Sequence, residues 1–201
     1  MDRSVIERSI IETEWKMFQK VKGIDGRADC QDQYRTFVVN RLSQFESWPI
    51  EVVSSYLLDL EEAVRQERNL VMEKYAWMME ETDPIYFSNI RHLLPDVSDD
   101  VKILANTIVG FYMRWEREVA STYPNVRMHG RPAEEIGDDK FNSISNYLKC
   151  EFYTYSYGTL DLLHKKIVKN PKNNLYWLSL TKLAQAYGYK DLDEAEAALK
   201  S

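Results

Sequence analysis

The chain has 201 residues, which is the length of one ordinary soluble domain and is enough to bury a core without a disulfide or a structural metal. Its 44% hydrophobic and 29% charged content excludes both a disordered chain and a membrane-embedded one. The 26 basic and 32 acidic residues give a formal net charge of −6. This balance disfavours a protein that coats nucleic acid, because such proteins neutralise phosphates with Lys and Arg.

The N-terminal stretch MDRSVIERSIIETEWKM interrupts its apolar residues with charge every few positions. It therefore predicts neither a signal peptide nor a membrane-spanning helix. The two cysteines, Cys30 and Cys150, are too few for a disulfide framework. We expect a cytoplasmic protein without a membrane partner, in which both cysteines are thiols.

Apolar residues recur at three- and four-residue steps along most of the chain, which is typical of amphipathic helices. The expected helices cover residues 4–22, 31–45, 49–82 with a continuation or bend near 68, 84–94, 98–123, 142–169, 173–187 and a short stretch from 191. Pro49 is a favoured first-turn residue, Ser98 is an N-cap, and Asp191 with Glu194 forms a capping-box signature. The sequence has no repeat and no linker, so it predicts an all-α single domain over residues 1–201, a bundle or orthogonal array of about seven to eight helices.

The longest irregular segment is PNVRMHGRPAEEIGDDK, residues 124–140, which is polar and interrupted by Gly130, Pro132 and Gly137. A segment of this length is either a mobile lid over a site or a plain surface connection. The sequence leaves both interpretations open.

Several common functional motifs are absent from the sequence. There is no G-x-x-x-x-G-K-[ST] or G-x-G-x-x-G loop to cradle phosphates, and no H-E-x-x-H or C-x-x-C pair to hold zinc. Asp161 and His164 form a single carboxylate-x-x-His pair, whereas a di-iron bundle usually needs two. We therefore expect no metal and no cofactor, and keep a metal-dependent bundle oxygenase using Asp161 and His164 as a third hypothesis.

Four charged residues share the apolar stripe of their own predicted helix: Glu14, Arg41, Lys74 and Glu151. Buried charges must be paired, and two acids with two bases make a neutral set. Such a set is either a structural ion-pair network or a polar pocket. In a pocket, Arg41 and Lys74 would hold a carboxylate or phosphate, while Glu14 or Glu151 would hold an amine or move a proton. Simple snorkelling of the side chains to the surface is the remaining alternative.

Tyr147, Glu151 and Tyr155 follow one another at i, i+4 spacing, so they share a helix face that could line a small-molecule site or belong to the core. Cys30 is expected at the first turn of the second helix, where the helix dipole and Arg27 would favour a thiolate. No histidine is near Cys30 in the sequence to act as a base, so it is either a nucleophile or a small buried thiol.

Three stretches, GRADCQDQYRTFVVNRLSQF, RNLVMEKYAWMM and YLKCEFYTYS, resemble an uncharacterised bacterial family that is catalogued only as a domain of unknown function. The resemblance covers nearly the whole chain and implies an intact single helical domain without an assigned chemistry. It also implies a helical companion of nucleotidyltransferase-like domains. The matching positions are Arg27, Cys30, Gln31, Phe37, Arg41, Ser43, Gln44, Asn69, Glu73, Lys74, Tyr75, Met78, Glu151, Tyr153 and Tyr155.

The leading functional hypothesis is a small-molecule-binding site between helices for a small polar, amino-acid-like ligand. If the protein is an enzyme, cofactor-free proton transfer or elimination fits the acids, bases and phenols present. The candidate catalytic residues are Glu14, Glu151, Tyr155 and Cys30, and the candidate ligand-binding residues are Arg41, Lys74, Gln31, Gln44 and Arg27. The alternative is a structural or protein-interaction module in which the inward charges only specify the fold. A homodimer would hide one aromatic face of such a domain.

Overall fold

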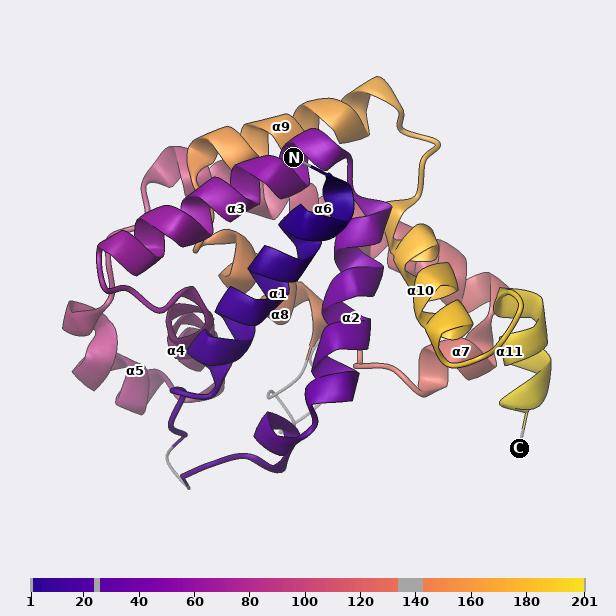
Figure 1. Cartoon of the computed structure of the whole chain (residues 1–201), viewed down its shortest axis with the longest axis horizontal. Helices are drawn as coiled ribbons and strands as arrows, with labels where there is room; N and C mark the ends of the chain where they lie inside the picture. The colour runs from indigo at the N-terminus through magenta and orange to yellow at the C-terminus, as the bar shows by residue number, and fades with distance from the viewer. Residues whose placement is uncertain (1, 24–25, 134–142, 201) are drawn as a thin grey trace.

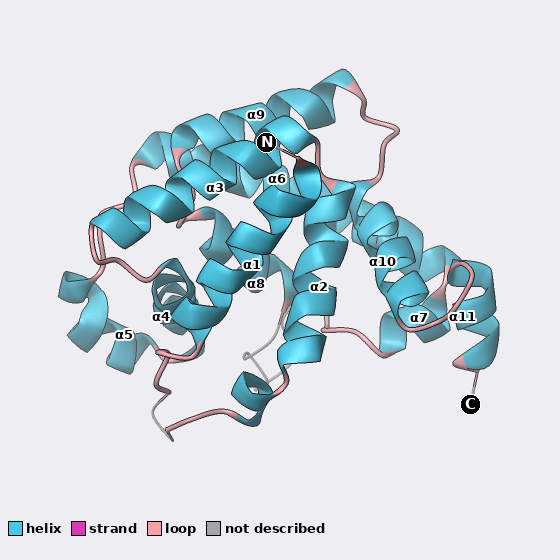
Figure 2. Ribbon diagram, viewed as in Figure 1, coloured by secondary structure: helices cyan, strands magenta, loops and turns pink. Residues whose placement is uncertain are grey.

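The helical spacing of the apolar residues is realised as an all-α fold in the computed structural model, which describes residues 2–23, 26–133 and 143–200 (Figure 1). Helices make up the regular structure of these residues, and Figure 2 shows no strand among them. The elements are α1 (Arg3–Phe18), η1 (Asp29–Asp32), α2 (Tyr34–Ser47), α3 (Ile50–Arg65), α4 (Leu70–Thr82), α5 (Pro84–Ile90), η2 (Arg91–Leu93), α6 (Asp99–Thr122), α7 (Pro124–Met128), α8 (Ile144–Phe152), α9 (Tyr157–Lys169), α10 (Leu175–Ala186) and α11 (Leu192–Ala198). The all-α expectation is confirmed.

Side-chain caps determine where several helices begin. The Ser98 hydroxyl accepts a hydrogen bond from the Val101 amide at the start of α6, and Asp191 accepts one from the Glu194 amide at the start of α11. Each cap satisfies a backbone N–H that has no partner within its own helix. Both starts were predicted from the sequence, and both are confirmed.

The described residues contain eleven α-helices, more than the seven or eight expected, because two predicted helices are each divided into two and the short helix α7 forms in the segment expected to be irregular. The helix expected over 49–82 ends at Arg65, Glu67 adopts a φ of 57°, and the Asn69 side chain caps the start of α4. The helix expected over 142–169 is interrupted at residues 153–156, after which the Ser156 hydroxyl accepts from the Thr159 amide and starts α9. In both places a side chain that can cap a helix begins a new one.

Two further expectations concern loops. The second helix begins at Tyr34 rather than near Gln31, because residues 29–32 form the separate 3₁₀ helix η1. The segment expected to be a lid or a surface connection starts with the short helix α7, and its residues 134–140 lie outside the described residues.

The helices surround α8, which packs against α4 on one side and α6 on the other. Helices α1, α2 and α3 lie side by side in front of it, α9 runs along the top, and α10, α7 and α11 form the flank that ends at the C-terminus (Figure 1). The main core joins α1, α2, α3, α4, α6, α8, α9 and α10 through buried side chains, among them Phe45, Trp48, Leu60, Phe152 and Leu163, and α7 and α11 pack on a separate smaller cluster. Within the described part of the chain, no helix has the length and apolar character needed to cross a bilayer. A residue on the inward face of α8 is therefore placed at the centre of the fold.

Two leucines of α3 test this core directly. Leu60 is 0% exposed and Leu58 is 63% exposed, so they differ in burial although they lie on the same helix. We expect Leu60→Ala to lower the free energy of unfolding by about 2–5 kcal/mol, because it leaves a cavity, and Leu58→Ala to change it by about 0.5 kcal/mol or less. Urea denaturation of both variants measures the difference, and equal losses would contradict the observed packing.

Candidate functional site

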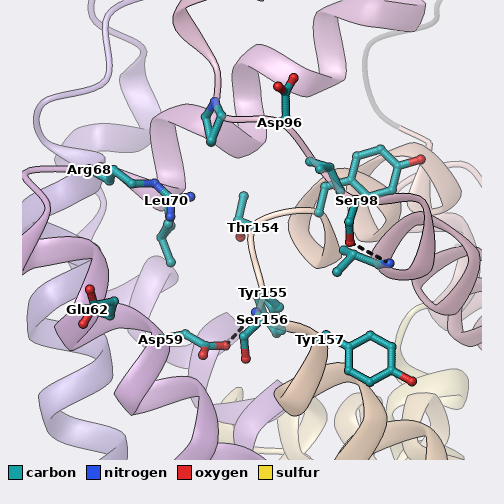
Figure 3. A pocket seen from close by; sticks show the side chains of 14 residues that line it. Asp59, Glu62, Arg68, Leu70, Asp96, Ser98, Thr154, Tyr155, Ser156 and Tyr157 are labelled. Carbon is teal, nitrogen blue, oxygen red and sulfur yellow. Dashed lines mark hydrogen bonds between the residues drawn. The ribbon is translucent and has the colours of Figure 1, made fainter.

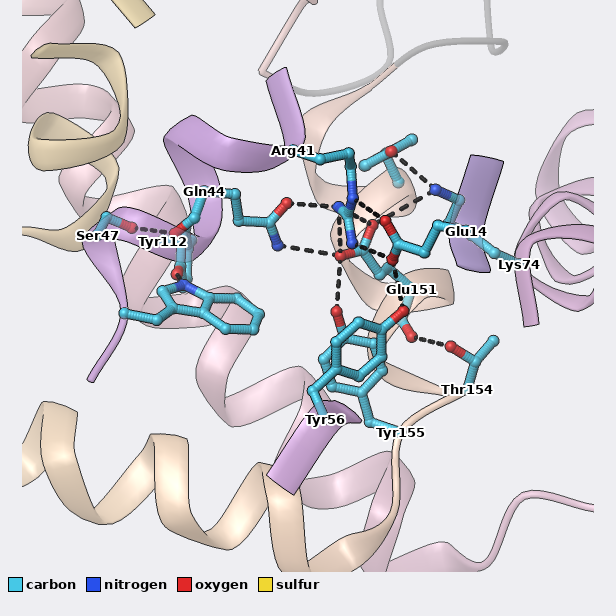
Figure 4. A network of polar contacts seen from close by, with 12 residues as sticks. Glu14, Arg41, Gln44, Ser47, Tyr56, Lys74, Tyr112, Glu151, Thr154 and Tyr155 are labelled. Carbon is cyan, nitrogen blue, oxygen red and sulfur yellow. Dashed lines mark hydrogen bonds and ion pairs between the residues drawn. The ribbon is translucent and has the colours of Figure 1, made fainter. Parts of the chain in front are cut away.

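The four charges that the helical stripes predicted to point inward meet at the centre of the fold (Figure 4). We call Glu14 from α1, Arg41 from α2, Lys74 from α4 and Glu151 from α8 the quartet. Their exposed fractions are 2%, 6%, 7% and 2%, so all four are buried. The sequence left open whether they would reach the surface, and the structure places them inside the protein as two acids and two bases.

Arg41 is the centre of the quartet. Its guanidinium binds Glu14 in a two-point contact, with Nε to Oε2 at 2.7 Å and Nη2 to Oε1 at 2.6 Å. The remaining nitrogen, Nη1, donates to Gln44 Oε1 at 2.6 Å and to Glu151 Oε1 at 3.0 Å. Charge-assisted pairs of this two-point geometry are the strongest hydrogen bonds that side chains form. Every nitrogen of the guanidinium is therefore engaged at short distance.

Three neutral groups complete the contacts of the two carboxylates. Glu151 Oε1 accepts from the Tyr155 hydroxyl at 2.9 Å and from Gln44 Nε2 at 3.0 Å. Glu14 Oε1 accepts from the Tyr56 hydroxyl at 2.6 Å. The rings of Tyr56 and Tyr155 stack with 4.3 Å between their centroids, so one aromatic pair closes this side of the quartet.

The electrostatics of the site keep the Glu151 carboxylate charged and the phenols of Tyr56 and Tyr155 neutral. Burial alone raises the pKa of the Glu151 carboxyl, but the charges of Arg41 and Lys74 outweigh it and bring the pKa to about 2. Burial, together with the nearby carboxylates, raises the pKa of Tyr56 and of Tyr155 well above the usual value of a phenol. At neutral pH Glu151 is therefore ionised and both phenols carry their protons.

Lys74 is held more weakly than Arg41. Its ammonium nitrogen donates to the Tyr147 hydroxyl at 2.8 Å but reaches Glu151 Oε2 only at 3.4 Å. It also lies 4.2 Å from the centre of the Tyr147 ring and 5.1 Å from that of Tyr75, which are cation–π distances. Both tyrosines are half-buried.

Arg27 and Gln31 bind elsewhere. The Gln31 amide nitrogen donates to the main-chain oxygens of Phe18 at 2.7 Å and Val21 at 3.0 Å, which lie at the end of α1. Arg27 pairs with Asp32 at 2.7 Å. The two residues thus hold the connection between α1 and α2, and their hydrogen bonds do not go to the quartet.

Cys30 is not at the first turn of the second helix, as expected from the sequence, but in η1, where it is exposed. The expected small buried thiol is therefore wrong for Cys30. Burial raises the pKa of Tyr75, and Lys74, Tyr147 and Cys30 are among the groups that act on that hydroxyl.

Sequence reasoning missed Tyr56, which binds Glu14 directly. Tyr56 follows Val52 and Val53 on the buried stripe of α3, where an aromatic residue indicates core packing. The signal that could have identified it is the phenol itself, because a buried tyrosine hydroxyl usually requires a partner.

The residues of the metal hypothesis have other neighbours. Asp161 pairs with Lys165 at 2.6 Å, and the His164 ring packs 6.2 Å from that of Phe111. Among the residues that the structure describes, no group of three or more His, Cys, Asp or Glu side chains could hold a metal ion.

A family model described as "Protein of unknown function (DUF4125)" matches residues 4–197. The chain belongs to this family. The match confirms the resemblance seen in the sequence, and it includes all four members of the quartet. No curated protein and no solved structure matches the chain. The DUF4125 description supplies no chemistry, so the function has to be argued from the site.

The burial of Arg41 generates a stability prediction. Arg41→Met leaves Glu14 buried without a counter-ion, so we expect the free energy of unfolding to fall by about 3–5 kcal/mol. Adding Glu14→Leu removes the stranded charge and leaves the neutral pair of Glu151 and Lys74, so most of the loss should be recovered. Urea denaturation measures both variants, and Lys165→Met, which breaks an exposed pair, is the control and should cost less than about 1 kcal/mol. Additive losses in the double variant would contradict this account of the network.

The pKa of Glu151 generates a second prediction. The folded protein lowers this pKa from 4.5 to about 2, so the carboxylate adds stability above pH 4.5 and loses it as the pH falls towards 2. The expected contribution is about 3 kcal/mol. We expect the free energy of unfolding of Glu151→Gln to depend less on pH across this window than that of the parent. Parallel stability curves for the two proteins would show that Glu151 is not held as an ionised group.

Proposed function

We propose that this protein binds a small polar molecule at the Lys74 end of the quartet. The observation that supports this proposal is the asymmetry between the two cations. Arg41 meets three partners at 2.6–3.0 Å, whereas Lys74 reaches its carboxylate only at 3.4 Å. An ammonium has three hydrogens to donate, and the one short hydrogen bond of Lys74 goes to a phenol. Lys74 thus retains the capacity to receive a carboxylate or a phosphate.

The charge balance favours an amino-acid-like zwitterion. A carboxylate bound to Lys74 would need its own charge balanced, because the four charges of the quartet already cancel. Of the two carboxylate oxygens of Glu151, Oε2 has the longer contacts, at 3.2 Å from Arg41 and 3.4 Å from Lys74. A ligand with a carboxylate on Lys74 and an ammonium on Glu151 Oε2 would replace the longest ion pair of the site without adding net charge.

Binding fits the site better than proton transfer does. A general acid or base works best with a pKa near the operating pH. Glu151, with a pKa of about 2, is a weak base, and Tyr155, with a raised pKa, is a weak acid. Neither Glu151 nor Tyr155 therefore has a pKa suited to the proton-transfer or elimination chemistry considered from the sequence.

The second candidate is a structural or interaction module, and the Glu14–Arg41 end favours it. There the guanidinium and the carboxylate satisfy each other without a ligand, and in the described residues no buried side-chain nitrogen or oxygen lacks a hydrogen-bond partner. The cytoplasmic location, the homodimer and the absence of a nucleic-acid partner stay predictions.

Native mass spectrometry of the protein as purified, repeated after denaturation, tests the binding proposal. We expect a small mass that is released on denaturation, carried by the parent and by the control Lys149→Met but not by Lys74→Met. Lys149 is a matched control because it is a half-buried lysine paired with an acid, Glu81, away from the quartet.

If the parent has a bare mass, the common amino acids and inorganic phosphate are titrated against it. A ligand of the Lys74 site should bind Lys74→Met about tenfold more weakly or worse. No saturable binding by any of these probes, or equal binding by the parent and Lys74→Met, would contradict the proposal and favour the structural module.

A further inference from the structure

A concave site lies beside the turn between α8 and α9 that carries Tyr155. It is a hollow of about 290 Å³, formed where α3, the start of α4, the segment before α6 and the α8–α9 turn come together (Figure 3). Figure 3 shows side chains from these separate parts of the chain around one open space. We call it the turn hollow. Its volume is close to the lower end of the range for small-ligand pockets.

The carboxylate of Asp59 lies in the turn hollow without an ion-pair partner among the described residues. Its Oδ2 accepts a hydrogen bond from the Ser156 amide at 3.0 Å, which fixes the side chain against the turn. Arg68 is the one basic residue that lines the hollow in the described chain, and its Nε and Nη2 both donate to Glu73, at 2.9 and 2.6 Å. The charge of Arg68 is thus balanced by Glu73, and that of Asp59 is left uncompensated.

Two hydroxyls of the turn, those of Thr154 and Ser156, also line the hollow and donate their own hydrogens within the protein. Thr154 Oγ1, on a residue that is 8% exposed, donates its hydrogen to the Glu151 main-chain oxygen at 2.7 Å. Ser156 Oγ donates its hydrogen to Thr159 Oγ1 at 3.2 Å. A hydroxyl has one hydrogen and two lone pairs. Thr154 Oγ1 therefore keeps acceptor capacity, and Ser156 Oγ, which also accepts from the Thr159 amide at 3.2 Å, keeps one lone pair. This part of the hollow is therefore rich in acceptors and poor in donors.

The hollow also has apolar lining residues between its polar ones. They are Leu70, Pro95, Val97 and Val101. An occupant that matches both kinds of lining residue has a hydrogen-bond-donating cation on a short aliphatic body.

We propose that the turn hollow binds a small aliphatic ammonium, with Asp59 as its counter-ion and Thr154 and Ser156 as hydrogen-bond acceptors. This site is separate from the one proposed at Lys74, and it has the opposite charge preference.

Isothermal titration with n-butylammonium chloride tests this proposal, with 1-butanol as the uncharged probe of similar shape. We expect saturable binding of n-butylammonium and none of 1-butanol. Asp59→Asn should weaken ammonium binding about tenfold or more, because the amide oxygen can still accept from the Ser156 amide but carries no charge.

Glu51→Gln is the matched control, because it removes one acidic charge from the same helix at an exposed position paired with Lys166. It should bind n-butylammonium as the parent does, so a loss confined to Asp59→Asn is specific to the turn hollow. Circular dichroism and thermal unfolding check that each variant is folded. No saturable binding to the parent, equal affinity of Asp59→Asn and the parent, or an equal loss in Glu51→Gln would overturn the proposal.

Discussion

The guanidinium of Arg41 is a charge inside a helical core, and it is stable there only because Glu14 and Glu151 reach it from two other helices. Removing such groups from water costs several kcal/mol per ion, and good geometry is needed to offset that cost. The two-point contact with Glu14, at 2.6 and 2.7 Å, supplies this geometry. Since the three side chains come from α1, α2 and α8, one interaction fixes how these helices are rotated about their axes. A packing that turned any of them away would leave an unpaired charge in the core.

The two ends of the quartet have different physical characters. At the Arg41 end, short hydrogen bonds and the stacked pair of Tyr56 and Tyr155 leave every group satisfied. At the Lys74 end, the contact with Glu151 is longer and the neighbouring tyrosines are half-buried. A rigid end that specifies the fold is compatible with the ligand site proposed at the less saturated end, because the first holds Glu151 in place for the second.

Much of the fold, and the four charges, could be predicted from the sequence because both depend on local periodicity. A charged residue flanked one turn away on both sides by apolar ones, as Glu14 and Glu151 are, must face the same way as its neighbours. The contacts of Gln31 could not be predicted, since they depend on how the chain returns past the end of α1. The interruption at residues 153–156 was missed for a similar reason. Tyrosine and threonine there carry no strong breaking signal, and only Ser156 acts as a cap.

That same interruption explains why two sites lie so close together. The Tyr155 hydroxyl donates to Glu151 in the quartet, and Thr154, Tyr155 and Ser156 all line the turn hollow (Figures 3 and 4). The Thr154 hydroxyl also donates to the main-chain oxygen of Glu151, so the turn holds this residue by its side chain and by its backbone. A ligand that stabilised the turn from the hollow would act on the carboxylate that faces Lys74. Any such coupling has to be reciprocal, because the free energy that links two binding sites is the same whichever site is filled first.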